Sequence, residues 1–300
     1  MVVSTCQAVF DVWTYIGAAS ALAIALIAFL YALGRILTKS ELESLAKKEL
    51  SEFFISFLIV IGVAGLSSIV CQVTPYVVKD VIGYGDQFSA SYDYLNTLIY
   101  KKGIPAIQRV WTSSIILDSI SSVESKFKIG KSSKLLEQAE VKVKPAAILK
   151  PLSKMLGIFT GIFQILIGSL QAQMVFIQLA EAFALTLILP IGMILRAIPG
   201  LRKGGSYLIA FAFGLYVVFP LMYVMNYSVY KIIEPSFGEL VSVQVNPIET
   251  FKLSSDIINI FKYFDEFSLL FPQALVLPAL NLTITIAFIS SFATFLSEIK

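Results

Sequence analysis

The stretch that decides the fold runs from Leu152 to Lys203 and reads LSKMLGIFTGIFQILIGSLQAQMVFIQLAEAFALTLILPIGMILRAIPGLRK. It is almost continuously apolar, yet polar residues recur along it at spacings of four, seven, seven and three: Thr160, Gln164, Gln171, Gln178 and Glu181. In an α-helix these spacings gather the side chains along one side. Amides and a carboxylate at membrane depth are costly unless they face a partner helix or a wet cavity. We therefore expect this stripe either to join neighbouring helices by hydrogen bonds or to line a watery path.

The composition around this stretch is that of a membrane protein. Of the 300 residues, 57% are hydrophobic and 14% charged, and the mean hydropathy is +0.82, well outside the usual range of soluble domains. The expected fold class is all-α: a polytopic membrane helix bundle with five spans favoured and six or seven left open. We expect it in the cell membrane as a multi-pass protein.

Several kinds of chemistry are disfavoured by the residues that the chain lacks. It has no histidine and only two cysteines, which argues against zinc sites and against His-based acid–base or nucleophilic catalysis. Gly130-Lys131-Ser132 resembles the end of a phosphate-binding loop, but Ser125 stands where that loop needs a glycine. We expect no enzymatic activity, no catalytic residue, no metal and no cofactor, so that any nucleotide energy comes from a partner.

The first 78 residues predict a transmembrane hairpin. Its spans are Val12–Leu37, interpreted as a retained span rather than a signal peptide, and Phe53–Val78. The short connection carries Arg35, Lys39, Lys47 and Lys48, which places it in the cytoplasm and the N-terminus outside. Cys6 and Cys71 then lie near the same outer surface, where they form either a disulfide or two free thiols.

Residues 79–151 predict an extracytoplasmic loop with a basic segment. Ile116, Ile120, Val123 and Phe127 recur at helical spacing, which predicts an amphipathic helix on the membrane surface or against a partner. Lysines dominate the following segment, opposed only by Glu137 and Glu140: Lys126, Lys128, Lys131, Lys134, Lys142, Lys144, Lys150 and Lys154. The patch either attracts phosphate backbones or lipid headgroups, or is a solvated loop.

Residues 152–300 predict a C-terminal transmembrane domain. Leu152–Ile198 would be about 70 Å long as one helix, more than twice a bilayer core of about 30 Å. We favour one long helix kinked at Pro190 over a segment that folds back at 171–173, because one crossing leaves Arg196, Arg202 and Lys203 in the cytoplasm, where they would meet phosphates or a partner. Two further spans follow, Ser206–Tyr230 and the proline-interrupted, polar Phe267–Leu296.

One short motif, Gly83-Tyr84-Gly85-Asp86, invites two specific interpretations. A potassium-channel filter needs a threonine where Val81 stands and an inner helix after it. An intramembrane aspartyl protease needs a second aspartate buried opposite the first, and the predicted spans contain none beyond Asp11 at an outer edge. A glycine-rich outer turn is the favoured interpretation.

Two stretches carry a resemblance to a known family. They are Ala182–Met225, which contains LPIGMILRAIPGLRKGGSYLIAFAFGLYVVFPLMYV, and Phe271–Leu296, which reads FPQALVLPALNLTITIAFISSFATFL. These resemble the CedA family, the polytopic membrane component of the archaeal DNA-import (Ced) system, itself similar to the inner-membrane channel-forming component of bacterial type IV secretion and conjugation systems. The resemblance implies an outside N-terminus, a large central outer loop and a cytoplasmic C-terminus.

The same resemblance implies function and partners. DNA would be the transported substrate, and a cytoplasmic motor ATPase and small pilin-like membrane proteins would be the partners within an oligomeric assembly. We therefore expect a channel or platform component of a DNA import or type IV secretion-like translocation machine. The alternatives are a small-molecule or ion transporter, favoured by the broken helices, and a structural membrane protein of pilus assembly.

Overall fold

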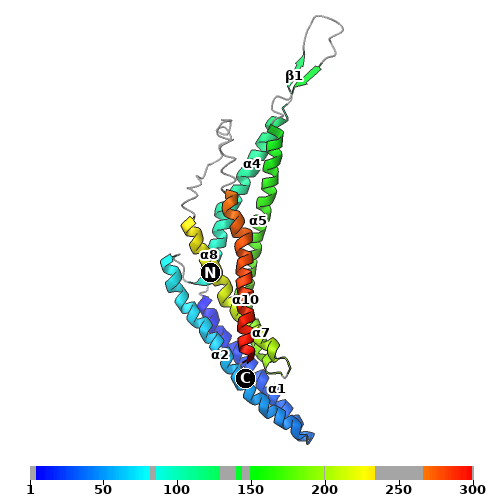
Figure 1. Cartoon of the computed structure of the whole chain (residues 1–300), viewed down its shortest axis with the longest axis vertical. Coiled ribbons are helices and arrows are strands. Elements are labelled where there is room, and N and C mark those ends of the chain that lie inside the picture. The colour runs from blue at the N-terminus through cyan, green and yellow to red at the C-terminus, as the bar shows by residue number, and fades with distance from the viewer. Residues whose placement is uncertain are drawn as a thin grey trace. The chain divides into compact units, whose positions relative to one another are not determined.

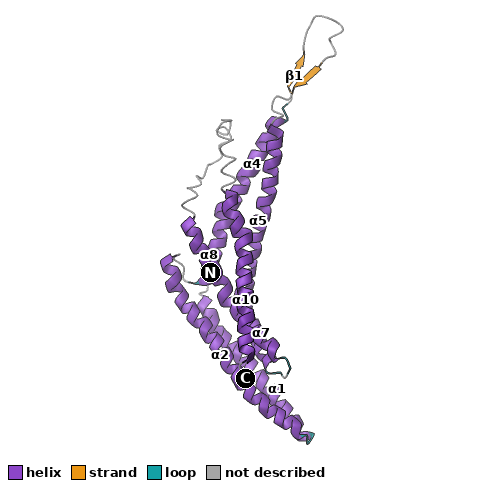
Figure 2. Ribbon diagram, in the orientation of Figure 1, coloured by secondary structure: helices purple, strands orange, loops and turns teal. Residues whose placement is uncertain are grey.

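The computed structural model describes residues 5–81, 86–123, 125–128, 140–143, 149–198, 200–233 and 266–298. Within them the fold is helical apart from one short hairpin (Figure 2). In this described part of the chain, five helices are long and apolar enough to cross a membrane: Val12–Ile36, Ser40–Val70, Lys150–Arg196, Arg202–Ile233 and Glu266–Glu298. The predicted all-α class with five spans is therefore confirmed, and the side of the membrane on which the N-terminus lies stays a prediction.

The chain forms two compact units, each assembled from segments that are distant in sequence. The first comprises Met1–Leu95, Ala172–Leu240 and Val276–Lys300, and the second comprises Asn96–Gln171 and Val241–Leu275. The consecutive segments 1–78, 79–151 and 152–300 expected from the sequence follow chain order, whereas the units follow spatial contacts. The helix α5, Lys150–Phe183, contributes its first part to the second unit and its last part to the first.

The first unit is built on two helical hairpins and one further long helix. In Figure 1, α1 (Thr5–Ile36) and α2 (Ser40–Val81) lie side by side, and α6 (Leu189–Arg196) turns back into α7 (Arg202–Phe213). The long helix α10 (Leu277–Glu298) packs against α7.

Glycine allows two of these helix pairs to approach closely. A Cβ at Gly205 of α7 would lie 2.5 Å from the backbone nitrogen of Arg196, and a Cβ at Gly214 would overlap the side chain of Ile289 on α10. The α6–α7 contact, and the contact of α10 with Gly214 directly after α7, therefore depend on the missing side chains, as is common where membrane helices pack closely.

Within the described residues, four π-helical segments interrupt the helices, and each one ends just before an X-Pro pair. They are η1 (Thr97–Gly103), η3 (Ala184–Ile188), η4 (Gly214–Val218) and η7 (Pro272–Val276), followed by Pro105, Pro190, Pro220 and Pro278. Proline cannot donate to the carbonyl four residues earlier, and its ring clashes with that carbonyl. Widening the preceding turn relieves the clash, so the predicted kink at Pro190 takes the form of a π-helical turn directly before it.

Side chains from other helices donate hydrogen bonds to two of the carbonyls to which these prolines cannot donate. The carbonyl four residues before Pro220 belongs to Tyr216, and Gln87 Nε2 donates to it at 2.7 Å. The carbonyl four residues before Pro278 belongs to Ala274, and Ser169 Oγ donates to it at 2.7 Å. The first contact lies within the first unit and the second within the second unit. Each replaces a hydrogen bond that the proline removes from a helix in an apolar surrounding.

The second unit pairs α4 (Ile104–Ser121) with the first part of α5. Ser114 and Ser153 each donate their hydroxyl to the other's backbone carbonyl at 3.1 Å. Arg109 forms a 2.6 Å ion pair with Glu266, which is 4% exposed. These polar contacts fix the relative register of three helical segments within the unit.

The amphipathic helix predicted through Phe127 is shorter than expected, and this prediction is corrected. The helix ends at Ser121, and the hydroxyls of Ser121 and Ser122 donate to the carbonyls of Asp118 and Ser119, which satisfies part of its last turn. Phe127 lies instead in β1 (Ser125–Lys128), paired antiparallel with β2 (Glu140–Val143). The alternation of lysines with Phe127 favours a strand over a helix there.

Candidate functional site

Three glutamines of the predicted stripe lie exposed on α5. Gln164, Gln171 and Gln178 recur every seven residues, and we call them the glutamine face. Within the described residues they make no hydrogen bond. The buried side of the same helix carries Leu156, Phe163, Leu166, Leu170 and Ile177, each at most 2% exposed. The glutamine face therefore borders the packed side of α5 without being covered by its own chain.

The other two members of the stripe are covered by the chain itself. Thr160 is 8% exposed, and its hydroxyl donates to the carbonyl of Leu156 at 3.0 Å. Glu181 is half-buried. It follows Gln178 by three residues, so its side chain points about 60° away from that of Gln178 around the helix axis. The five side chains therefore differ in their surroundings: three amides are exposed, and the threonine and the carboxylate have partners within the chain.

Glu181 accepts a hydrogen bond from a helix that the sequence did not predict. This is α3 (Gln87–Asn96), and the Tyr92 hydroxyl donates to Glu181 Oε2 at 2.6 Å. Burial, and secondarily the Glu181 carboxylate, raise the pKa of Tyr92 above its usual value, so the hydroxyl keeps its proton and remains a donor. The contact joins α3 to the end of α5 within the first unit.

Further polar contacts fix α3 against η4 and α8 (Phe219–Ile233). Besides the bond from Gln87 to Tyr216, the Ser91 hydroxyl donates to the carbonyl of Pro220 at 3.1 Å, and the Tyr227 hydroxyl donates to Asp93 at 2.7 Å. The polarity of this segment predicts an outer loop, not a packed helix. The sequence signal for the helix is a set of small, aromatic and aliphatic residues at helical spacing, each at most 1% exposed: Phe88, Ala90, Ser91, Tyr94 and Leu95.

Asp86 of the glycine-rich motif caps this helix. Its Oδ1 accepts a hydrogen bond from the backbone N–H of Ser89 at 2.5 Å, the usual role of an aspartate at a helix N-terminus. Residues 82–85 lie outside the described ranges, so the channel-filter and protease interpretations of the motif are not addressed there.

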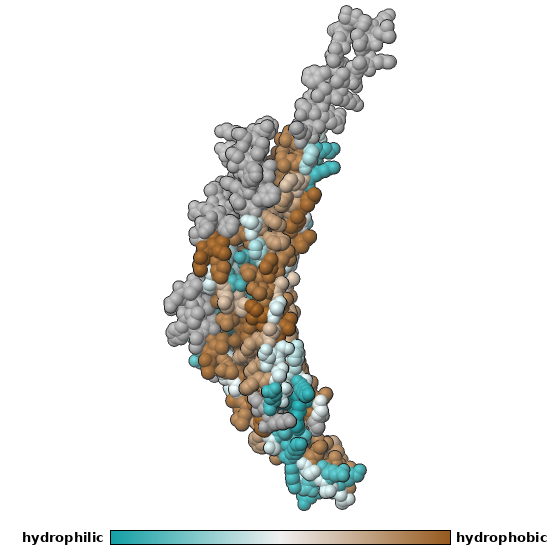
Figure 3. Space-filling model, in the orientation of Figure 1, coloured by the Kyte–Doolittle hydropathy of each residue, from teal (hydrophilic) through white to brown (hydrophobic). Residues whose placement is uncertain are grey.

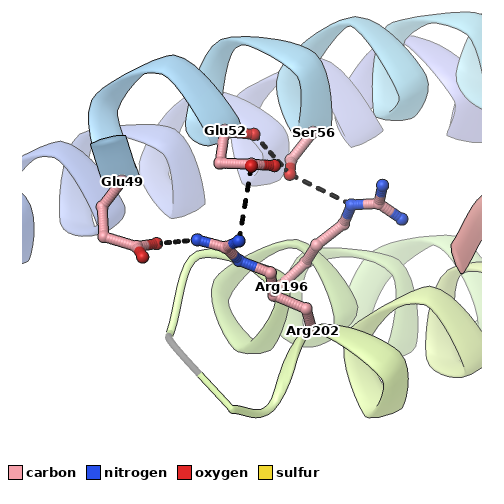
Figure 4. A network of polar contacts seen from close by, with 5 residues as sticks. All are labelled: Glu49, Glu52, Ser56, Arg196 and Arg202. Atoms are coloured by element: carbon pink, nitrogen blue, oxygen red, sulfur yellow. Dashed lines mark hydrogen bonds and ion pairs between the residues drawn. The ribbon is translucent and has the colours of Figure 1, made fainter. Parts of the chain in front are cut away.

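A second polar cluster joins four helices around two arginines, two of whose partners on α2 are drawn with them in Figure 4 as Glu49 and Ser56. The buried Arg196 of α6 donates from Nε to Ser56 Oγ at 3.1 Å, and from one terminal nitrogen to Ser206 Oγ at 2.5 Å and to the carbonyl of Leu296 at 2.9 Å. These partners come from α2, α7 and α10. One planar guanidinium therefore joins all four helices.

The second arginine of the cluster binds two carboxylates. Arg202 forms ion pairs with Glu49, whose side chain is 4% exposed, and with Glu52 at 3.5 Å. Both glutamates lie on α2, so the pairs tie α2 to the start of α7. Arg196 and Arg202, for which phosphate or partner contacts are expected, thus make contacts within the chain, and their phosphate or partner contacts stay a prediction. Lys203 remains exposed beside them.

The remaining predicted site residues fall outside the described side chains. They are Lys126, Lys128, Lys131, Lys134, Lys142 and Lys144 of the basic segment, and Cys6 and Cys71 of the expected disulfide or free thiols. The backbone register alone is described for the hairpin, and it places Lys126 opposite Lys142. Lys150 and Lys154, at the start of α5, are exposed.

The described residues hold no group of three or more Cys, Asp or Glu side chains that could bind a metal ion. Comparisons of the chain with protein-family models, curated proteins and solved structures find no match. Function therefore has to be argued from the glutamine face, the arginine cluster and the length of the helices.

Proposed function

We propose that this chain is a membrane-embedded channel or platform component of a machine that moves DNA across the cell membrane, powered by a separate ATPase. The observation that carries the proposal is the glutamine face. Three amides stand open on an otherwise apolar helix, where lipid offers them no hydrogen bond. They therefore face either a wet path or the subunit contact that shapes one.

The length of the helix supports an assembly over an isolated protein. The run from Lys150 to Arg196 is 47 residues, about 70 Å, against a bilayer core of about 30 Å. Figure 3 shows the apolar surface that the described helices present on the face in view. A helix that is both apolar and much longer than the bilayer is typical of a subunit whose excess surface is covered by protein.

Charge distribution supports a polyanion as the transported molecule. The glutamine face is neutral, so it neither traps nor repels phosphates, and Glu181 is turned toward Tyr92. The segment from Lys126 to Lys154 holds eight lysines against two glutamates, which is suited to gathering DNA by counterion release. The motor ATPase and pilin-like partners follow from the family resemblance.

The proposal is tested by DNA uptake in cells. Replacing the lysines between Lys126 and Lys154 with glutamine should lower uptake and reduce its dependence on salt, because fewer counterions are released. The control replaces exposed lysines outside this segment, such as Lys39 and Lys48, with glutamine. Unchanged uptake in the first variant would reject the role of the basic segment, and purification without any ATPase would reject the motor partnership.

A transporter of small solutes is the second candidate, because its typical broken helices are present as π-helical turns. Freed carbonyls at such breaks often coordinate ions. Here the carbonyls of Tyr216 and Ala274 already accept hydrogen bonds from Gln87 and Ser169. Because both carbonyls already accept hydrogen bonds, a structural role for the two π-helical turns is favoured over ion coordination. Flux of a labelled ion or solute through liposomes that contain the chain alone would support the transporter instead.

A further inference from the structure

We propose that the glutamine face of α5 is the surface on which a second copy of this chain packs, with the two α5 helices parallel. The inference deepens the proposed function, because it assigns the face to a subunit contact, and it rests on that function only in treating the chain as part of an assembly. Three observations carry it: the extent of the exposed surface, its repeat and its charge.

The extent of the exposed surface excludes lipid as its sole cover. Exposed apolar side chains run along the helix from Met155 to Ile191, about 54 Å at a rise of about 1.5 Å per residue. A bilayer core spans only about 20 of these residues. If it surrounds the first part of α5, Gln164 and Gln171 lie in hydrocarbon. If it surrounds the last part, Gln178 lies in hydrocarbon. Either placement leaves at least one exposed amide in lipid without a hydrogen-bond partner, unless another protein chain covers it.

A seven-residue repeat in the sequence runs along this side of the helix. Gly161-Ile-Phe-Gln164 is followed by Gly168-Ser-Leu-Gln171 and then by Val175-Phe-Ile-Gln178. Nothing lies within 4 Å of a Cβ added at Gly161 or at Gly168. Small residues that repeat every seven positions beside hydrogen-bonding amides match the spacing at which two membrane helices pack with a small crossing angle.

Symmetry identifies the partner as the same chain. All copies of a membrane protein insert in one orientation, so a rotation axis along the membrane normal brings each residue to the depth of its equivalent. An amide is both donor and acceptor, and each glutamine can therefore bond to its own counterpart. The helix carries no charged residue between Lys154 and Glu181, so two identical faces meet without repulsion. A different protein would need amides at the same three depths.

The test is crosslinking in native membranes. Single cysteines replace Gln164 or Gln171 in a chain with Cys6→Ala and Cys71→Ala, and two epitope tags mark different copies. The matched controls are Ile158→Cys and Ile165→Cys, which are also exposed and a heptad apart but lie on another side of α5. Oxidation should give a dimer that carries both tags from the glutamine positions and much less from the isoleucine positions. Equal yields from the two sets, or a crosslink to a different protein, would overturn the proposal.

A second measurement covers the case in which the cysteine-free chain fails to fold. Benzoylphenylalanine at 164 or 165, in the chain with both native cysteines, should photo-crosslink a second copy from 164 and not from 165. The variant with all three glutamines replaced by leucine should associate roughly 20- to 30-fold more weakly, about threefold per lost amide pair. Because these assays need no DNA, a dimer through this face with unchanged DNA uptake in the leucine variant would support the contact and count against its role in translocation.

Discussion

The side-chain amide of Gln87 donates a 2.7 Å hydrogen bond to the carbonyl of Tyr216, the group that Pro220 cannot bond. The helix α3 therefore supplies the hydrogen bond that Pro220 cannot make within its own helix. Gln87 is 3% exposed, and its Oε1 makes no hydrogen bond among the described residues, so donation is the function of this amide.

Replacing Gln87 with leucine should lower the free energy of unfolding by about 1–3 kcal/mol, because it removes a donor from a buried carbonyl. In a Pro220→Ala background the cost should be smaller, since alanine restores the backbone N–H. Thermal unfolding of the four proteins of this double-mutant cycle, in detergent, measures the coupling. An equal cost of Gln87→Leu in both backgrounds would show that the bond does not compensate for the proline.

Arg196→Ala should destabilise the first unit more than any exposed substitution nearby. It removes hydrogen bonds from a charged donor to Ser56, Ser206 and the carbonyl of Leu296, and such bonds contribute about 1.5–3 kcal/mol each. Arg196→Lys should recover only part of the lost stability, because a single ammonium group cannot reproduce the several donors of the planar guanidinium. The same unfolding assay checks both variants. The control is Lys203→Ala, expected to stay within about 0.5 kcal/mol; a similar effect of Lys203→Ala and Arg196→Ala would refute the assignment.

The ion pair between Arg202 and Glu49 predicts rescue by exchange of the charges. Glu49→Arg alone should be strongly destabilising. The Glu49 side chain is only 4% exposed, so the substitution places a second arginine beside Arg202 at a buried position. Adding Arg202→Glu should restore part of the stability. Membrane insertion and melting temperature are the measurements. Failure of the double variant to improve on the single one would indicate that packing, and not the charge pair, holds α2 to α7.

Tyr92→Phe should weaken the attachment of α3 by about 1.5–3 kcal/mol, because it removes the donor to the Glu181 carboxylate. Burial raises the pKa of Tyr92, so the stabilisation is fully present below the pKa of an unfolded tyrosine, about 10, and is lost only as the pH rises beyond it. The difference between the two proteins should therefore be constant from about pH 7 to 9. A difference that changes within this range would point to another titrating group.

Hydropathy and helical spacing predicted the five long helices, because apolar length alone decides which segments can cross a bilayer. The disruption before Pro190 was also predictable, since it depends on one residue. The partners of Arg196 were not, because Ser56 lies 140 residues away and nothing local in the sequence records such a pairing. Nor was α3: its polar residues bond to backbone groups of another helix, so hydropathy could not distinguish it from an outer loop.

The central claim, that protein covers the glutamine face, is tested most directly by the collision rates of spin labels at 164, 171 and 178 in native-like vesicles. Oxygen reports lipid exposure, and a water-soluble nickel complex reports water. Our account predicts low collision rates with both reagents at these positions, and a high rate with one of them at Ile165, the exposed residue on another side of the same helix. High oxygen collision rates at 164, 171 and 178 would show that the glutamines face lipid, and would contradict the account.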